Sequence, residues 1–151
     1  MCSSDLWSQR LRERFMRNMP DVAARIRFLP RMSWPDTLAM MAQSDVVLDT
    51  FHFGGGNTTC EALVMGAPVV VLPSPFLRAR VSLGIYRHLG ITDTVADSPA
   101  DYVARALRIA RDRDHRADLQ QRIAGRVDTL FGQKQAIASF ANRLEQAYAA
   151  A

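Results

Sequence analysis

The chain has 151 residues, a formal net charge of +4 and a hydrophobic share of 48%, which suits one domain with a buried core. It holds no run of about eighteen apolar residues, and charges interrupt its opening MCSSDLWSQRLRERF, so neither a membrane span nor a secretory signal is predicted. Cys2 and Cys60 form no C-x-x-C pattern, which argues against a zinc site and a disulfide framework. We therefore expect a soluble, cytoplasmic protein with no membrane partner.

The positive charge is almost entirely arginine, since Lys134 is the sole lysine. The arginines are spread along predicted helices together with aspartate and glutamate, and alanine is abundant. The mutational bias of a GC-rich bacterial genome produces such a composition. No clustered basic stripe with interleaved aromatic residues is present, so a nucleic-acid partner is not expected.

The first predicted helix is amphipathic and ends before Pro20. Its apolar face holds Trp7, Leu11, Phe15 and Met19. A connector (21–25) leads to a short predicted strand at 26–29 (IRFL), which Pro30 stops. A second helix is predicted to open at 33–36 (SWPD), because serine suits the cap and proline suits the first turn.

The central stretch predicts a strand, a glycine-rich turn, a helix and a second strand. The first strand covers 46–48, and the second is the apolar run 68–73, which is short and continuous enough to be buried on both faces. Between them, glycines at 54–56 permit positive φ and a close approach of a ligand to the backbone. The helix spans 57–65 and ends at Gly66, where a C′ residue belongs. In such βαβ units, ligands bind beside the carboxyl end of the first strand.

The carboxyl-terminal half predicts helices at 76–89, after a cap at 97–99 and after Gly132, with a short strand at 94–96. Residues expected on buried helix faces are Leu77, Val81, Ile85, Leu89, Val103, Leu107, Ala110, Leu119, Ile123, Val127 and Leu130. Strands alternating with helices indicate an α/β fold: a three-layer Rossmann-like parallel sheet with helices on both faces, followed by a helical carboxyl-terminal extension. The predicted strands are fewer than the roughly five to six of an average sheet, so at least one further strand is expected upstream.

A glycine turn before a helix suits a phosphate group, because the helix amino terminus offers unpaired N–H groups and partial positive charge. Gly55 and Gly56 would let the phosphate approach the backbone. The turn is neither a P-loop nor a G-x-G-x-x-G fingerprint, which disfavours ATPases and nicotinamide cofactors. The sequence shows no metal-ligand cluster and no Ser/His/Asp or Cys/His arrangement.

Thr58 and Thr59 can donate hydroxyl hydrogen bonds to phosphate oxygens. Thr58 and Glu61 also have the spacing of a capping box, in which they would only close the helix terminus, and the residue types do not decide between the two roles. Glu61 could otherwise accept hydrogen bonds from the vicinal hydroxyls of a ribose.

Four further residues are expected at the same edge of the sheet: Asp49, His52, Arg78 and Arg80. Asp49 is interpreted as a turn acceptor rather than a site group, and His52 as a loop residue that could touch a ligand without catalysing. Arg78 and Arg80 could reach the site, but a solvated helix face is favoured for at least one of them.

The stretch DVVLDTFHFGGGNTTCEALVMGAPVVVLP, followed by FLRARVSLGIYRHLGI, resembles the carboxyl-terminal nucleotide-sugar-binding domain of the O-linked N-acetylglucosamine transferase family. The resemblance covers about residues 25–148. It rests on Asp49-Thr50, Thr58-Thr59, the acidic residue 61, Gly66-x-Pro68 and Arg80-Val81. Members of this family are GT-B enzymes, often preceded by tetratricopeptide repeats.

The resemblance implies that Thr58 and Thr59 hold the diphosphate of a nucleotide sugar and that Glu61, an aspartate in the animal enzymes, holds the ribose. Asn57 stands where those enzymes have a histidine that contacts the donor. The resemblance further implies inverting transfer from a UDP-GlcNAc-like donor to a protein. No metal or other cofactor is expected, because the helix dipole and a lysine offset the charge of the leaving diphosphate.

That lysine and the amino-terminal GT-B half have no counterpart in this sequence. The resemblance therefore implies that residues 1–151 form a single nucleotide-sugar-binding domain of a longer two-domain enzyme. On its own, the chain is expected to turn over poorly or not at all.

Two alternatives to a transferase stay open. A nucleotide-sugar epimerase or hydrolase of GT-B architecture would need acid/base carboxylates or histidines in the cleft, and no convincing pair is visible. A non-enzymatic GT-B-like interaction domain would use the glycine turn only structurally, and nucleotide binding separates it from the enzymes. In GT-B enzymes the last helix commonly crosses back to the first domain. The resemblance therefore implies that Phe140, Leu144 and Tyr148 leave an apolar face of the last helix uncovered here, and hence self-association.

Overall fold

The computed structural model describes residues 3–150. The chain divides into two compact units, Met1–Trp34 and Pro35–Ala151. Within the described residues, no helix combines the length and the apolarity that crossing a bilayer requires. Whether both units form one nucleotide-sugar-binding domain stays a prediction.

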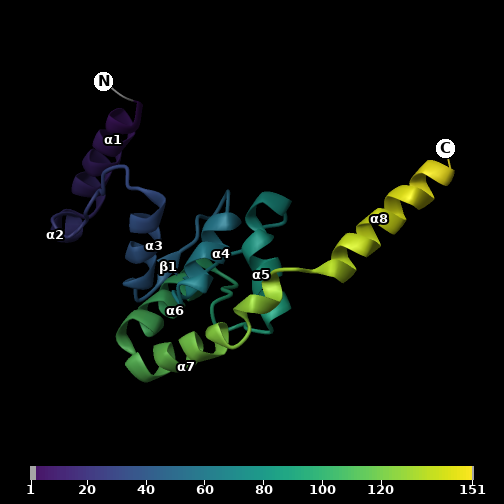
Figure 1. The fold of residues 1–151 in the computed structure, drawn as a ribbon. Coiled ribbons are helices and arrows are strands. Elements are labelled where there is room, and N and C mark those ends of the chain that lie inside the picture. The colour runs from purple at the N-terminus through teal and green to yellow at the C-terminus, as the bar shows by residue number, and fades with distance from the viewer. Residues whose placement is uncertain (1–2, 151) are drawn as a thin grey trace. The chain divides into compact units, whose positions relative to one another are not determined.

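The amino-terminal unit holds α1 (Ser3–Asn18) and the short α2 (Pro20–Ala23), drawn in purple in Figure 1. The predicted helix end before Pro20 is confirmed, and the predicted connector is partly helical. The Phe28 ring lies 6.1 Å from the Phe15 ring and 4.9 Å from the Arg12 guanidinium. The strand predicted at 26–29 is wrong: this segment is irregular. No strand runs beside it in the described part of the unit, so its backbone has no ladder to join.

The larger unit is built on the predicted βαβ arrangement, which is confirmed. Strand β1 (Val47–Leu48) pairs in parallel with β2 (Val69–Val70), and α4 (Asn57–Val64) connects them. The expected third strand at 94–96 contributes one parallel bridge, Val71 to Val95. Among residues 3–150 the sheet is therefore much smaller than the predicted three-layer Rossmann-like sheet, which is not confirmed.

Helix α4 ends as its sequence predicts. Gly66 has a φ of +79°, its N–H donates to the Leu63 carbonyl at 3.0 Å, and the Ala67 N–H donates to the Ala62 carbonyl at 2.8 Å. These two bonds form a Schellman motif, which satisfies carbonyls at the helix end. The chain thereby turns from α4 directly into β2.

The helix predicted at 76–89 is broken into two parts. A 3-10 turn, η1 (Leu77–Ala79), precedes α5 (Val81–Leu89), and Arg80 between them has a non-helical φ of −124°. The break changes the phase of the helix, so the predicted inward position of Leu77 is wrong and its side chain is 81% exposed. The residues of α5 that are buried are Ser82, Leu83, Tyr86 and Leu89.

Two further helices cover the sheet. Helix α3 (Trp34–Ala42) precedes β1, and α6 (Pro99–Arg111) is capped by Ser98 as predicted, since the Ser98 hydroxyl accepts from the Asp101 N–H. Helix α6 buries Tyr102 and Ile109 and leaves the predicted inward residues Val103 and Leu107 exposed. Its phase differs from the prediction because the Tyr102 hydroxyl is anchored inside, 2.8 Å from the Asp49 carbonyl.

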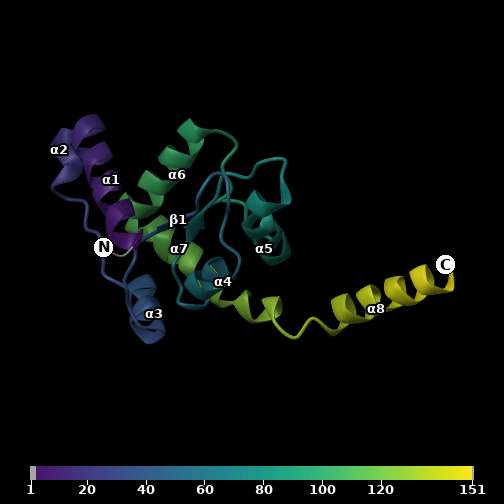
Figure 2. The same ribbon diagram turned by 90° about the horizontal axis from the view of Figure 1, so that it is seen from above.

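The carboxyl-terminal segment continues as α7 (Arg113–Ala124), η2 (Val127–Leu130) and α8 (Lys134–Ala149). Leu119, Ile123 and Val127 are buried in the core, as predicted. Helix α8, the yellow helix of Figure 2, has no buried residue. Phe140, Leu144 and Tyr148 are at least 57% exposed, as predicted, and Ile137 is exposed as well.

Candidate functional site

Asp49 follows β1 and organises the glycine turn. Its Oδ1 accepts hydrogen bonds from the Gly55 N–H at 2.7 Å and from the Thr50 N–H at 2.9 Å. The interpretation of Asp49 as a turn acceptor is confirmed. Because the Asp49 carbonyl also accepts from the Tyr102 hydroxyl, this residue is fixed through both its side chain and its backbone.

Ser82, near the start of α5, is a residue that sequence reasoning missed. Its Oγ lies 2.8 Å from Asp49 Oδ2, 2.9 Å from the Gly55 carbonyl oxygen and 2.9 Å from Thr59 Oγ1. The side chain is only 2% exposed. The one signal in the sequence is a small polar residue in an otherwise apolar part of a helix, and this signal does not name its partners.

The turn glycines are needed for close packing rather than for positive φ. Among the described glycines, positive φ occurs only at Gly66, Gly90 and Gly132. A Cβ on Gly54 would lie 2.9 Å from Asp49 Oδ2, and one on Gly55 would lie 2.6 Å from Thr59 Oγ1. The sequence attributed these two glycines to positive φ and to the close approach of a ligand. Positive φ is wrong for both, and the atoms that closely approach them belong to Asp49 and Thr59.

Helix α4 begins directly after this turn, with Gly56 as its N-cap and no side-chain capping bond. Of the two roles left open for Thr58, the capping box with Glu61 is not the one found, since Gly56 is the N-cap and Thr58 is already the second residue of the helix. The first bond of the helix runs from the Cys60 N–H to the Gly56 carbonyl at 3.1 Å. The N–H groups of residues 57–59 precede this ladder and give the helix end its partial positive charge.

The two threonines have different environments. Thr58 and Asn57 are exposed, whereas Thr59 is 2% exposed and its hydroxyl is engaged by Ser82. Thr58 can therefore offer a hydroxyl at the surface of the helix end. The Thr59 hydroxyl is engaged inside the protein.

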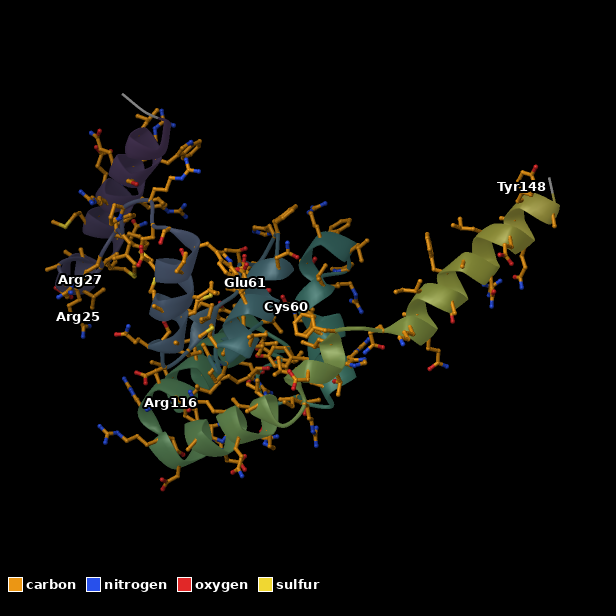
Figure 3. The ribbon with its side chains drawn as sticks, viewed as in Figure 1. Arg25, Arg27, Cys60, Glu61, Arg116 and Tyr148 are labelled. Carbon is orange, nitrogen blue, oxygen red and sulfur yellow. The ribbon has the colours of Figure 1, made fainter. Side chains whose placement is uncertain are left out.

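Glu61 and Cys60 lie one turn into α4 and are partly buried (Figure 3). Glu61 follows Asn57 by four residues and Thr58 by three, spacings that place side chains on one face of a helix. Burial, and secondarily the charge of Glu61, raise the pKa of the Cys60 thiol. Among the described residues no group of three or more His, Cys, Asp or Glu side chains could hold a metal ion.

The remaining predicted site residues hold the loops around the turn. Arg80 Nη1 donates to the Ser74 carbonyl at 3.2 Å, and Arg78 Nε donates to the His52 carbonyl at 3.0 Å. The Arg78 carbonyl in turn accepts from the Gly54 N–H at 2.8 Å. The His52 side chain is exposed. Both arginines are thus tied to backbone carbonyls rather than to solvent alone.

A family model described as Glycosyl transferase family 41 matches residues 21–140. The chain belongs to this family. A probable UDP-N-acetylglucosamine--peptide N-acetylglucosaminyltransferase SPINDLY from Oryza sativa subsp. japonica is 29% identical over 119 residues, which are 76% of this chain and 13% of the relative. The UDP-N-acetylglucosamine--peptide N-acetylglucosaminyltransferase of Caenorhabditis elegans is 35% identical over 94 residues, which are 61% of this chain and 8% of the relative.

The structure is also similar to a solved one. A mutant of the Thermobaculum terrenum O-GlcNAc transferase matches with a TM-score of 0.77 and 31% identity, over 93% of this chain and 26% of that one. The family 41 chain therefore has a GT-B-like α/β fold. It spans only 8% and 13% of the two curated relatives.

Proposed function

We propose that this chain is the donor-binding part of an O-linked glycosyltransferase and that it binds the diphosphate of a nucleotide sugar at the amino terminus of α4. The observation that carries the proposal is that the start of α4 is exposed at residues 57 and 58 and follows a glycine turn that is fixed by hydrogen bonds. Membership of family 41 supports it, as do relatives named UDP-N-acetylglucosamine--peptide N-acetylglucosaminyltransferase.

Each exposed residue of the helix end has a proposed role. The N–H groups of residues 57–59 and the Thr58 hydroxyl bind the diphosphate oxygens. Glu61, on the same face of α4, accepts from the ribose hydroxyls. Asn57 contacts the donor, and its amide offers both a donor and an acceptor group.

The chemical contribution of this chain is electrostatic. As the bond from the sugar to the diphosphate breaks, negative charge grows on the leaving group, and preorganised N–H donors at a helix terminus stabilise that charge. We propose inverting transfer from a UDP-GlcNAc-like donor to a protein without a metal ion. The acceptor contacts and the acid/base groups would come from other parts of a longer protein, so the chain alone would turn over poorly.

Calorimetric titration of the chain with UDP, GDP and their sugars tests the proposal. We expect saturable binding of one nucleotide, unchanged by a chelator and weakened by Thr58→Ala. If the folded chain binds none of these ligands, the donor-binding proposal fails and a non-enzymatic interaction domain becomes the better reading.

A further inference from the structure

We propose that Ser82 is a positioning residue of the donor site, which sets the geometry of the glycine turn without touching the ligand. This inference rests on the proposed function, because the donor is what the turn would position. Ser82 lies in α5, outside the stretch that carries the proposed donor contacts.

The Ser82 hydroxyl joins three separate segments. Within 2.9 Å of its Oγ lie the Asp49 carboxylate after β1, the Gly55 carbonyl in the turn and the Thr59 hydroxyl in α4. A hydroxyl has one proton to donate, and a carboxylate is the strongest acceptor of the three. The favoured order is therefore a donation from Thr59 to Ser82 and from Ser82 to Asp49.

This chain of bonds holds Gly55 through Asp49, whose Oδ2 accepts from Ser82 and whose Oδ1 accepts from the Gly55 N–H. The Gly55 N–H donates to Asp49 Oδ1 at 2.7 Å, and the Gly55 carbonyl oxygen lies 2.9 Å from Ser82 Oγ. The orientation of the turn before the Gly56 N-cap is thereby fixed. Because backbone N–H groups bind a phosphate only along their own direction, turning this segment would misdirect the donors at residues 57–58.

Because Ser82 is buried, its side chain can affect the binding of a ligand only indirectly. At 2% exposure the side chain cannot meet a ligand, so any effect on binding must pass through the turn. Removal of its hydroxyl would leave the buried Thr59 hydroxyl without this partner and would remove the donor that fixes the Asp49 carboxylate, to which the Gly55 N–H is bonded.

Tyr86 offers a matched control on the same helix. It lies one turn after Ser82, is also buried, and its hydroxyl accepts from the Val69 N–H at 2.8 Å, a backbone group of β2 rather than of the glycine turn. Tyr86→Phe therefore removes a buried hydroxyl and lowers stability without changing the contacts of Asp49 or Gly55.

The experiment compares Ser82→Ala, Ser82→Cys and Tyr86→Phe with the unchanged 151-residue chain. The readouts are the Kd for UDP, measured well below each Tm, and native-state amide exchange at residues 55–57. We expect Ser82→Ala to weaken UDP binding about tenfold and to speed exchange of the turn amides. The thiol of Ser82→Cys is a weak donor, so its Kd and its exchange rates should lie between those of the unchanged chain and Ser82→Ala. Tyr86→Phe should lower Tm and leave the Kd and the exchange rates unchanged.

Equal Kd values and equal exchange rates in the Ser82 variants and the unchanged chain would overturn the inference. Equal losses in Tyr86→Phe would also overturn it, because the effect would then be general destabilisation. If Ser82→Ala does not fold, Ser82→Cys carries the same comparison. If the unchanged chain binds no nucleotide, the proposed function fails, and amide exchange alone then decides whether Ser82 orders the turn.

Discussion

Thr58 and Thr59 are neighbours of the same residue type, yet the fold gives their side chains opposite environments. Thr58 is exposed at the end of α4, whereas Thr59 is buried against Ser82. The local sequence does not distinguish the two threonines, because it does not show that the hydroxyl of Thr59 bonds to Ser82 in α5. At the scale of single residues, the start of α4 thus separates an exposed hydroxyl from a buried one that is bonded inside the protein.

The first prediction compares Thr58→Ala with Thr59→Val. Thr58→Ala should weaken nucleotide binding about tenfold and leave Tm nearly unchanged, since its side chain is exposed. Thr59→Val should lower the free energy of unfolding by about 1–3 kcal/mol, because it leaves buried polar groups with one partner fewer. Titration calorimetry and urea unfolding measure the two effects. Equal changes in both variants would contradict the separation.

Tyr86 gives the second prediction, on pH. Burial raises the pKa of Tyr86 to about 12, whereas an unfolded tyrosine titrates near 10. Between these two values the folded chain keeps a proton that the unfolded chain loses. The contribution of the protonated Tyr86 to the free energy of unfolding is therefore complete below about pH 10 and declines up to about pH 12. The slope is at most about 1.4 kcal/mol per pH unit.

Burial, and then the charge of Asp49, raise the pKa of Tyr102 to about 12 as well. Urea unfolding at several pH values above 9 should show the combined decline. Tyr86→Phe should be less stable at neutral pH, because it loses the bond from Val69, but its stability should fall less steeply with pH. A slope identical to that of the unchanged chain would contradict this assignment.

At the scale of elements, the sequence predicted what depends on nearby residues. The parallel βαβ unit was predictable from two apolar runs on either side of a helix. Gly66 correctly predicted the end of α4, because the positive φ that ends the helix depends on the residue at that position alone. The strand predicted at 26–29 is wrong because a strand needs a neighbouring strand, and the local sequence pattern does not show whether one is present. The helix break at Arg80 likewise has no local signal.

The structure contains the glycine turn and the helix start that the sequence predicted, and their role in binding a ligand stays a prediction. The glycine turn and the exposed residues of α4 lie where the sequence placed them. The roles of Thr59 and Gly55 follow instead from contacts with Ser82, which is separated from them by 23 and 27 residues. Contacts of such sequence separation leave no periodic pattern, so they became visible only in the folded chain.

The third prediction concerns two glycines with different surroundings. A Cβ at Gly55 would meet Thr59 Oγ1 at 2.6 Å, so Gly55→Ala should cost about 1–3 kcal/mol of unfolding free energy. Gly84 lies inside α5 and has nothing within 4 Å of such a Cβ, so Gly84→Ala should stabilise by roughly 0.5–1 kcal/mol. Thermal unfolding of both variants checks the signs, and a neutral Gly55→Ala would show that the turn is not tightly packed.

At the scale of the whole molecule, α8 carries an apolar stripe without burying any residue. Ile137, Phe140 and Leu144 recur at helical spacing with exposures of 57–68%. Apolar stripes of this kind are more common at protein contacts than on free surfaces. The stripe is the strongest feature of this chain that favours association.

The fourth prediction is therefore that the isolated chain self-associates. Sedimentation velocity over a range of concentrations should show a rising average mass, and the double variant Phe140→Ser/Leu144→Ser should shift the distribution toward monomer. Because neither residue packs in the core, Tm should change little. A monomer at every concentration would contradict the prediction.

The bonds of Ser82 and Tyr102 to Asp49 also bear on how the protein is made. During synthesis, the ribosome releases Asp49 and the helix end of α4 well before Ser82, 33 residues later, and Tyr102, 53 residues after Asp49. A nascent chain that stops before α5 contains every proposed phosphate contact, yet it lacks the side chains that orient them. The proposed donor site would thus become competent late in translation, after the residues proposed to contact the donor have already left the ribosome.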